Sequence, residues 1–318
     1  MKVIEHLQKS KNTLFSFELL PPLKGHNIEG IYRTIDPLME FNPSFVNITY
    51  HQEEVVYKKH KSGLLEKKTV RKRPGTVAIS AAIKYKYPKL DVVPHLICGG
   101  FTKEDTEYAL IDFHFLGINN ILALRGDPPK TLHVFVPEKD GHAYASELVE
   151  QILRMNKGIY LDEEMENTAS TDFCVGVAGY PEKHIESPNR TSDLEYLKRK
   201  IDAGAEYIIT QMFYDNKKYF EFVKGCRDAG INVPIIPGLK PITILRDINI
   251  LPKVFYIDIP EELVREVQKC KSNEEAFQVG IEWSIQQSKE LIEFGVPVLH
   301  FFTIGISSNI RQIAKAVF

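Results

Sequence analysis

The chain has 318 residues, of which 43% are hydrophobic and 26% charged, and its formal net charge is −2 at pH 7. This composition is typical of a globular protein, and the charge gives no overall reason to expect nucleic acid or a membrane as partner. The four cysteines are scattered without a CxxC pair, which argues against structural zinc and favours a reducing, cytoplasmic setting. We expect neither export nor a membrane anchor, because the sequence has no apolar leader and no run of about 20 apolar residues.

Eight short apolar runs recur along the chain, each followed by a turn and then by a segment of helical periodicity. They cover residues 14–20, 45–50, 92–98, 120–125, 173–180, 207–213, 233–239 and 298–304. Such alternation predicts parallel β/α units. Eight units in a chain of this length predict a TIM barrel, (β/α)8, so we expect residues 1–318 to form a single catalytic domain.

The segments between these runs have helix signals. Thr102 is a predicted N-cap, with Asp105 in the first turn, and Gly117 is the predicted stop of the same helix. Two charged stretches break the pattern. Residues 58–73 hold eight Lys or Arg against one acid, within a predicted loop insertion at about 52–73, and the sequence LDEEMEN near residue 163 is acidic. Solvated surface is the simplest interpretation of both, although the basic stretch could cover a phosphate-bearing cofactor or cosubstrate.

Polar residues stand where the predicted strands end. In a barrel of this type the catalytic groups gather at the carboxyl ends of the strands. Each residue alone could cap a helix or solvate a loop, but the set predicts a site at one rim. Its members are Glu18, Thr49, Tyr50, His95, Arg125, Gly126, Asp127, Tyr180, His184, Gln211, Lys240 and Thr303.

Two carboxylates stand out in this set. Glu18 lies inside the apolar run FSFELLPP, where burial is expected to raise its pKa and suit it to proton donation; a salt bridge inside the barrel, with Lys240 as candidate, is the alternative. Asp127 is close to Arg125 and precedes two prolines, so it is expected to stay ionised. One protonated acid and one lasting anion indicate acid catalysis beside a developing cation. Gln211 could contact a heterocycle or cap its own backbone.

Several common motifs are missing from the sequence. It contains no HExxH, GxGxxG, GxxxxGK[ST] or GxSxG. We therefore expect no metal site, no Rossmann dinucleotide site and no P-loop. The letters RGD at residues 125–127 are interpreted as a coincidence at a strand end.

A family resemblance connects these observations. The blocks FSFELLPP, VNITY, VPHLIC, ALRGDPP, AYAS, AGYPEKH, LKRKIDAGA, ITQMFYD, IIPGLKP and HFFT occur in this order between about Leu14 and Thr303, and together they resemble the bacterial methylenetetrahydrofolate reductases. The resemblance implies a (β/α)8 barrel with noncovalent FAD at the strand ends. It also implies a ping-pong reaction in which NADH or NADPH reduces the flavin, which then converts methylenetetrahydrofolate to methyltetrahydrofolate for methionine synthesis. A homo-oligomer is a further family expectation.

The resemblance also implies roles for individual residues. Glu18 would be the general acid, Asp127 would stabilise the folate cation and tune the flavin, and Gln211 would hold the folate. Arg125, His184 and Lys200 are the implied partners of the FAD diphosphate or ribityl chain. The implied FAD site comprises Thr49, Tyr50, His95, Leu124, Arg125, Gly126, Asp127, Tyr144, Ala145, Ala178, Tyr180, His184, Asp193 and Lys200.

The sequence departs from the family pattern at three places. His51 to Glu54 replace a small-residue run, Gly305 and Ile306 stand where many members have an Asn-Arg pair, and Leu251 is the only candidate for a Phe that packs on substrate. The sequence has no counterpart of the eukaryotic regulatory domain, so no inhibition by S-adenosylmethionine is expected. Two alternatives stay open: a pterin-dependent methyltransferase barrel without FAD, and a barrel that has lost catalysis and serves as a binding subunit.

Overall fold

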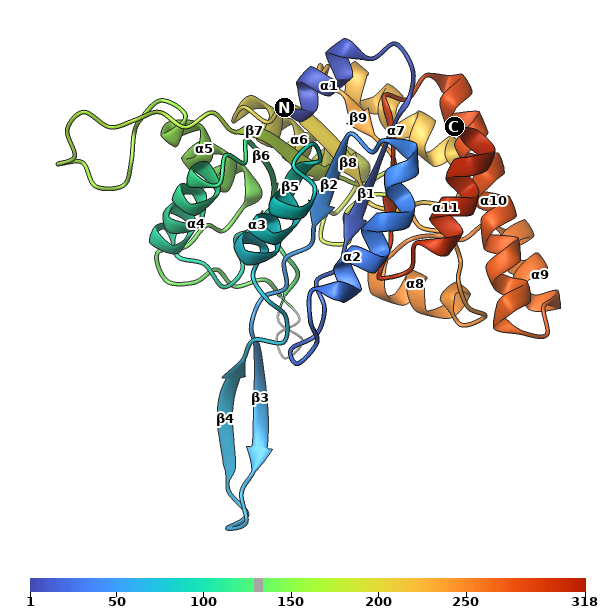
Figure 1. Cartoon of the computed structure of the whole chain (residues 1–318), viewed down its shortest axis with the longest axis horizontal. Coiled ribbons are helices and arrows are strands. Elements are labelled where there is room, and N and C mark those ends of the chain that lie inside the picture. Colours follow the sequence, from blue (N-terminus) through green and yellow to red (C-terminus); the bar gives the residue numbers. More distant parts are fainter. Residues whose placement is uncertain (129–133) are drawn as a thin grey trace.

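The computed structural model describes residues 1–128 and 134–318, and its centre is a ring of parallel strands (Figure 1). Going around the ring, the strand order is β10-β11-β1-β2-β5-β6-β7-β8-β9. The strands are β1 (Leu14–Leu19), β2 (Phe45–Ile48), β5 (Asp91–Ile97), β6 (Asn120–Leu124), β7 (Cys174–Gly179), β8 (Tyr207–Thr210), β9 (Ile235–Ile236), β10 (Gly238–Leu239) and β11 (Val298–Phe302).

The predicted eight-stranded barrel is confirmed, with one strand divided in two. The run 233–239 forms β9 and β10, which are separated by Pro237. Strand β9 pairs with β8 and β10 pairs with β11, so this broken strand brings the two ends of the sheet together. The His300 backbone N–H donates to the Pro237 carbonyl at 3.2 Å, and the Gly238 N–H donates to Thr210 Oγ1 at 3.0 Å.

Helices surround the barrel and fill the connections between its strands (Figure 1). The predicted helix after Thr102 is confirmed: the Asp105 N–H donates to Thr102 Oγ1 at 3.1 Å, and Gly117 follows the helix with φ +64°. No helix in the described part of the chain is long and apolar enough to cross a membrane. The helices are α1 (Val3–Lys9), α2 (Glu29–Ile35), the 3-10 helix η1 (Asp36–Phe41), α3 (Thr76–Lys86), α4 (Lys103–Phe115), α5 (Ala145–Met155), α6 (Arg190–Asp202), α7 (Asn216–Asp228), α8 (Asp247–Phe255), α9 (Glu261–Lys269), α10 (Asn273–Phe294) and α11 (Ser308–Val317).

The inside of the barrel changes from apolar to polar along its axis. Side chains alternate between the two faces of each strand, so every second residue points inward. Near the strand beginnings these inward residues form an apolar cluster that includes Phe45, Tyr207 and Val298, and Val3 of α1 packs against it. Farther along, the inward positions are polar and culminate in Glu18. The apolar layer supports this polar layer and leaves the strand ends available for chemistry.

The basic stretch forms an antiparallel hairpin of β3 (Glu54–Lys59) and β4 (Leu65–Val70). It leaves the rim at the end of β2 and projects away from the barrel (Figure 1). Its lysines are exposed to solvent, in agreement with the simplest interpretation of the sequence. At its base, Arg73 donates to the Pro21 carbonyl and the Lys24 N–H donates to the Lys72 carbonyl, which ties the hairpin to the loop after β1.

Candidate active site

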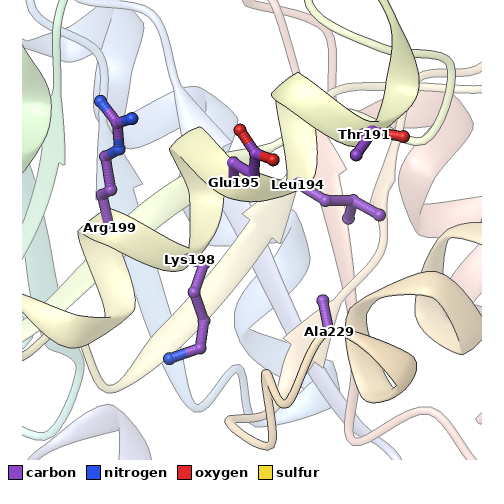
Figure 2. Close-up of a pocket in the computed structure, with 6 residues that line it drawn as sticks. All are labelled: Thr191, Leu194, Glu195, Lys198, Arg199 and Ala229. Atoms are coloured by element: carbon purple, nitrogen blue, oxygen red, sulfur yellow. The ribbon is translucent and has the colours of Figure 1, made fainter.

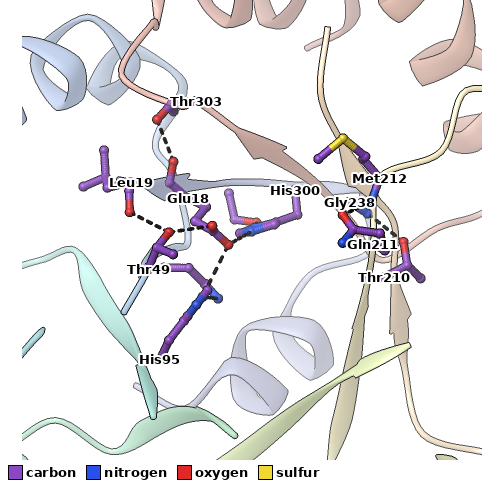
Figure 3. A network of polar contacts seen from close by, with 12 residues as sticks. Glu18, Leu19, Thr49, His95, Thr210, Gln211, Met212, Gly238, His300 and Thr303 are labelled. Carbon is purple, nitrogen blue, oxygen red and sulfur yellow. Dashed lines mark hydrogen bonds and ion pairs between the residues drawn. The ribbon is translucent and has the colours of Figure 1, made fainter. Parts of the chain in front are cut away.

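The carboxylate of Glu18 is the centre of a hydrogen-bonded group at the end of β1 (Figure 3). Its Oε1 accepts a hydrogen bond from Thr49 Oγ1 at 2.6 Å. Its Oε2 lies 3.3 Å from His95 Nε2 and 3.9 Å from His300 Nε2. The residue that follows β2 and two histidines within β5 and β11 therefore converge on one carboxylate of β1.

Strand register explains why these side chains meet. Strand β1 pairs with β11 and with β2, and Ser16 stands opposite His300. The Ser16 hydroxyl lies 2.8 Å from His300 Nδ1, and the Asn47 amide nitrogen lies 3.4 Å from His95 Nε2. Ser16 thus holds the His300 ring at the nitrogen opposite the one directed toward Glu18, whereas Asn47 contacts the same His95 nitrogen that faces Glu18.

His300 is the member of this group that the strand-end reasoning missed. It lies two residues before the end of β11 and is fully buried, and the search of the strand ends selected Thr303, just beyond this strand, instead. The signal that could have found it is strand alternation in VLHFF, which puts a histidine inward at the level of Ser16. A histidine in that position needs a polar partner, because a buried unpaired imidazole is costly.

The environment of Glu18 lowers its pKa. Burial alone would raise the pKa, but attraction to His95 and the polar contacts with His300 outweigh burial and hold the pKa well below its usual range. Burial also lowers the pKa of His300, which favours a neutral ring. The predicted raised pKa of Glu18 is therefore wrong, because the sequence pattern named His95 but did not show that His95 and His300 both contact this carboxylate. The predicted alternative partner is also wrong: Lys240 Nζ pairs with Asp247 Oδ2 at 3.2 Å.

A second group of side chains gathers beyond β6 and β7 and is mainly cationic. Arg125 Nη1 contacts Glu186 Oε2 at 2.5 Å, and Lys200 Nζ donates to the Ala178 carbonyl at 2.5 Å. Burial, reinforced by Arg125, lowers the pKa of both His184 and Lys200, that of Lys200 to about 8 despite Asp193. Arg125 thus acts electrostatically on both His184 and Lys200.

Tyr180 and Gly126 line the same part of the mouth. The Tyr180 ring packs edge-on against His184, with ring centroids 4.7 Å apart. Burial raises the pKa of Tyr180, with a contribution from Asp127, so the phenol stays neutral. Gly126 has φ +87°, and a Cβ there would lie 3.1 Å from Ile97 Cδ1. The positive φ and the close contact with Ile97 together favour glycine at this position.

Gln211 follows β8 and faces a small recess at the mouth. Its Oε1 accepts from the Met212 N–H at 2.9 Å, so the capping alternative accounts for the carbonyl end of the amide. Tyr180 and Glu182 line the same recess. Glu182 Oε2 accepts from the Asp258 N–H at 2.7 Å, and burial raises the pKa of Glu182 to about 7. This contact joins the loop after α8 to the loop after β7.

The remaining predicted positions lie around this mouth with different exposures. The Tyr50 ring packs edge-on against Phe101 at 5.1 Å, and Gln52 Nε2 donates to the Asp127 carbonyl at 2.9 Å, so the unusual segment after β2 reaches the end of β6. Tyr144 is exposed just before α5, whose first residue is Ala145. Pro129, the second proline after Asp127, lies outside the described residues.

Two of the family departures have clear structural settings. Gly305 has φ +83° in an exposed turn after β11, and Ile306 is exposed beside it. Leu251 is buried in an apolar cluster with Met212 and Ile242. Leu251 therefore has no surface for a substrate, and its suggested role is wrong.

A recess on α6 does not coincide with this mouth. Figure 2 shows its lining, which comes from α6 and from Ala229, the residue that follows α7. None of its lining residues belongs to the predicted site. They are Thr191, Leu194, Glu195, Lys198, Arg199 and Ala229.

Comparison with known proteins identifies the family. The sequence model described as "Methylenetetrahydrofolate reductase" matches residues 2–317. The chain belongs to the methylenetetrahydrofolate reductase family. It is 31% identical over 325 residues to "Methylenetetrahydrofolate reductase (NADH) 1" of Arabidopsis thaliana, covering 97% of this chain and 49% of that protein. It is also 31% identical over 291 residues to the Escherichia coli 5,10-methylenetetrahydrofolate reductase, covering 91% and 86%.

The resemblance stated from sequence blocks is thus confirmed at the level of the methylenetetrahydrofolate reductase family. A Caenorhabditis elegans relative named as a probable NADPH enzyme is 30% identical over 316 residues. The chain spans about half the length of the eukaryotic relatives it matches. Among solved structures, a Clostridium thermocellum protein titled as binding two copies of 5-methyltetrahydrofolic acid has a TM-score of 0.60 at 15% identity, covering 99% of this chain and 97% of that one. This last likeness concerns the fold alone.

Proposed function

We propose that the protein reduces methylenetetrahydrofolate to methyltetrahydrofolate, using FAD that is reduced by NADH or NADPH in a ping-pong cycle. The observation that carries this proposal is the half-buried Glu18 carboxylate, held by Thr49 and His95 at the barrel mouth of a member of this family. The methyl product would supply methionine synthesis. Relatives named for NADH and for NADPH both match, so either nucleotide is a candidate donor.

The residues beyond β6 and β7 have the chemistry that FAD needs. Arg125, His184 and Lys200 can neutralise a diphosphate, and their mutual influence on pKa indicates that they act on one region. Gly126 allows the chain to turn just after β6, and Tyr180 offers a neutral aromatic ring. The other FAD residues implied by the resemblance belong to the same proposal. When bound, FAD would carry the hydride between the nicotinamide and the folate.

Glu18 would supply the proton for the folate step. Opening the five-membered ring of methylenetetrahydrofolate requires a proton on the departing nitrogen, which a carboxyl group can give. His95 and His300 keep Glu18 ionised in the protein alone. A folate that covers the mouth would remove the remaining water and so raise the pKa of Glu18, which couples protonation to substrate binding.

Asp127 and Gln211 would act on the opened folate. Ring opening leaves a cationic one-carbon unit, and a nearby carboxylate such as Asp127 stabilises positive charge in a water-poor site. The Asp127 backbone is held by Gln52, which fixes the loop that carries this carboxylate. Gln211 would orient the pterin through its amide nitrogen, since its carbonyl oxygen is held by the Met212 N–H.

An anaerobic absorption spectrum tests this function. The purified protein is incubated with FAD, then NADH or NADPH is added, and finally methylenetetrahydrofolate. Flavin bands should bleach with the nicotinamide and return with the folate, with methyltetrahydrofolate as product.

The same experiment separates the alternatives. A protein that never binds FAD but binds the folate would favour the pterin-dependent methyltransferase. A protein that binds both without turnover would favour the binding subunit. Either result contradicts the proposed reductase.

A further inference from the structure

The β3–β4 hairpin has exposed surfaces that the proposed reaction does not use. In the described part of the chain, β3 and β4 pair only with each other, as a sheet separate from the barrel. A two-stranded sheet alone is marginally stable in water. Nevertheless this one exposes large apolar side chains: Tyr57 is 59% exposed, Leu65 is 65% exposed, and Leu64 in the turn is 73% exposed. A partner that covers these residues would stabilise the extended arm.

The strand register puts cations beside these apolar residues. Tyr57 pairs with Lys67 and Lys59 pairs with Leu65. Residues directly opposite each other in an antiparallel pair share a face, and alternation puts both pairs on the same one. This face is therefore apolar and positively charged, and Lys61 in the turn adds to its charge. The matching partner surface is acidic with exposed apolar groups.

The chain itself carries such a surface, in the segment between α5 and β7. Its exposed acids include Glu163, Glu164 and Glu166, with Asp162 beside them. Met165 among them is 52% exposed and Ile159 before them is 45% exposed. Figure 1 shows this segment projecting from the barrel well away from the hairpin, so the two surfaces of one copy do not meet.

The barrel topology allows the two surfaces to meet between copies. The hairpin follows β2 and so leaves the rim at the strand carboxyl ends, whereas the acidic segment precedes β7 and lies at the opposite rim. A two-fold axis that sets two barrels antiparallel brings the hairpin rim of each copy next to the acidic rim of the other. The contact then forms twice and closes the assembly as a dimer.

We propose that the β3–β4 hairpin of one copy docks on the acidic segment 159–166 of a second copy, forming a symmetric dimer through two equivalent contacts. The net charge of −2 gives no general attraction for other polyanions, while the acidic segment matches the hairpin in both charge and apolar content. This interface does not depend on the proposed reaction.

Charge reversal in the full-length protein tests the interface. One variant carries Lys59→Glu, Lys61→Glu and Lys67→Glu, and the other carries Glu163→Lys, Glu164→Lys and Glu166→Lys. Sedimentation equilibrium should find the unchanged protein as a dimer of 36.4 kDa subunits. Each variant alone should dissociate at least about tenfold more readily, and an equimolar mixture should regain the dimer, because both contacts are then again between opposite charges.

A matched control reverses three lysines elsewhere. Lys217→Glu, Lys224→Glu and Lys289→Glu change exposed helix positions by the same charge, and this variant should remain dimeric. Circular dichroism of every variant checks that the barrel is folded. A monomeric unchanged protein would overturn the proposal, as would charge-reversed variants that keep their dimer or a mixture that fails to regain it.

Discussion

His300 Nε2 lies 3.9 Å from Glu18 Oε2, while Ser16 Oγ lies 2.8 Å from the other nitrogen of the same ring. Ser16 and Glu18 are two residues apart on β1, so the imidazole spans one repeat of that strand. The ring cannot turn away without losing the serine contact. His300 is thus a positioning residue that acts on the proposed acid from inside the barrel.

Replacing His300 should change the pH dependence of the folate step. In His300→Asn the burial of Glu18 persists while one interaction that lowers its pKa is lost, so the pKa rises. A general acid works below its pKa, and the high-pH limit of folate reduction should therefore move to higher pH. Rapid-reaction rates of both half-reactions between pH 5 and about 9 measure this. His142→Asn removes a buried histidine that contacts Gln151 instead, and it should leave the profile in place. An unchanged profile in His300→Asn would exclude the role.

Glu18→Gln should separate the two half-reactions. The amide cannot supply a proton, so folate reduction should fall by roughly 10² to 10⁴-fold. Reduction of the flavin by the nicotinamide needs no proton from this group and should be largely unchanged. Stopped-flow absorbance follows each step separately. Equal losses in both steps would contradict the proposed role.

Asp127→Asn should slow folate reduction by about 10²-fold, because the neutral amide no longer stabilises the cationic one-carbon unit. The substitution keeps the side-chain size, and the Gln52 contact to the Asp127 backbone carbonyl does not involve the changed atoms. Single-turnover reoxidation of the reduced flavin by the folate measures the effect. Asp112→Asn, at an exposed position of α4, is the matched control. A folate step as fast as in the unchanged protein would rule out this assignment.

FAD affinity should depend on Lys200 and on pH. Burial lowers the Lys200 pKa to about 8, so the free site has its cation below that pH and loses it as pH rises. FAD should therefore bind more weakly above about pH 8, and Lys200→Met should bind about 10 to 100-fold more weakly at pH 7 with a smaller pH effect. Flavin fluorescence titration gives the dissociation constants. Lys198→Met removes a more exposed lysine of the same helix that pairs with Asp202, and it should have little effect. Equal affinity in the two variants would count against the diphosphate site.

Replacing each of two glycines by alanine should have opposite effects on the free energy of unfolding. A Cβ on Gly280 of α10 would lie 2.0 Å from the Ile242 carbonyl oxygen, so Gly280→Ala should lower the free energy of unfolding by about 1 to 3 kcal/mol or more. Gly30 of α2 has no atom within 4 Å of the same position, and Gly30→Ala should raise it by up to about 1 kcal/mol through helix propensity. Urea unfolding measures both. A neutral Gly280→Ala would show that α10 moves away without cost.

The barrel was predictable because its strands have a strong local signature. Apolar runs bounded by turns indicated all eight strand positions, and the polar residues after them indicated the rim that carries the site. Most predicted strands extended slightly too far, as with 207–213, where β8 ends at Thr210. The apolar pattern continues into the mouth because Met212 and Phe213 are buried by the surrounding helices, and pairing rather than hydropathy decides where a strand ends.

The electrostatics of the site were not predictable in the same way. The low pKa of Glu18 depends first on His95 and then on His300. His300 is separated from Glu18 by most of the chain and meets it only through the β1–β11 register. Lys240 was a reasonable partner for Glu18 by residue type. It forms its ion pair instead with Asp247, which lies only seven residues away along the chain. The residue types show which interactions a side chain can make. Which partner it meets depends on how the strands pair, and the sequence alone does not give that pairing.

The interruption at Pro237 divides the seventh strand of the barrel into β9 and β10. The two ends of the sheet meet at this divided strand, which is therefore the seam of the barrel. Strands β9 and β10 have two residues each, so few ladder hydrogen bonds hold this part of the ring, and a proline can contribute none through its nitrogen. In native-state hydrogen exchange, the backbone N–H groups of β9 and β10 should exchange faster than those of β1 or β7. Thr210 and Gln211 adjoin this seam. Local opening of the barrel would therefore disturb first the side where the folate is proposed to bind.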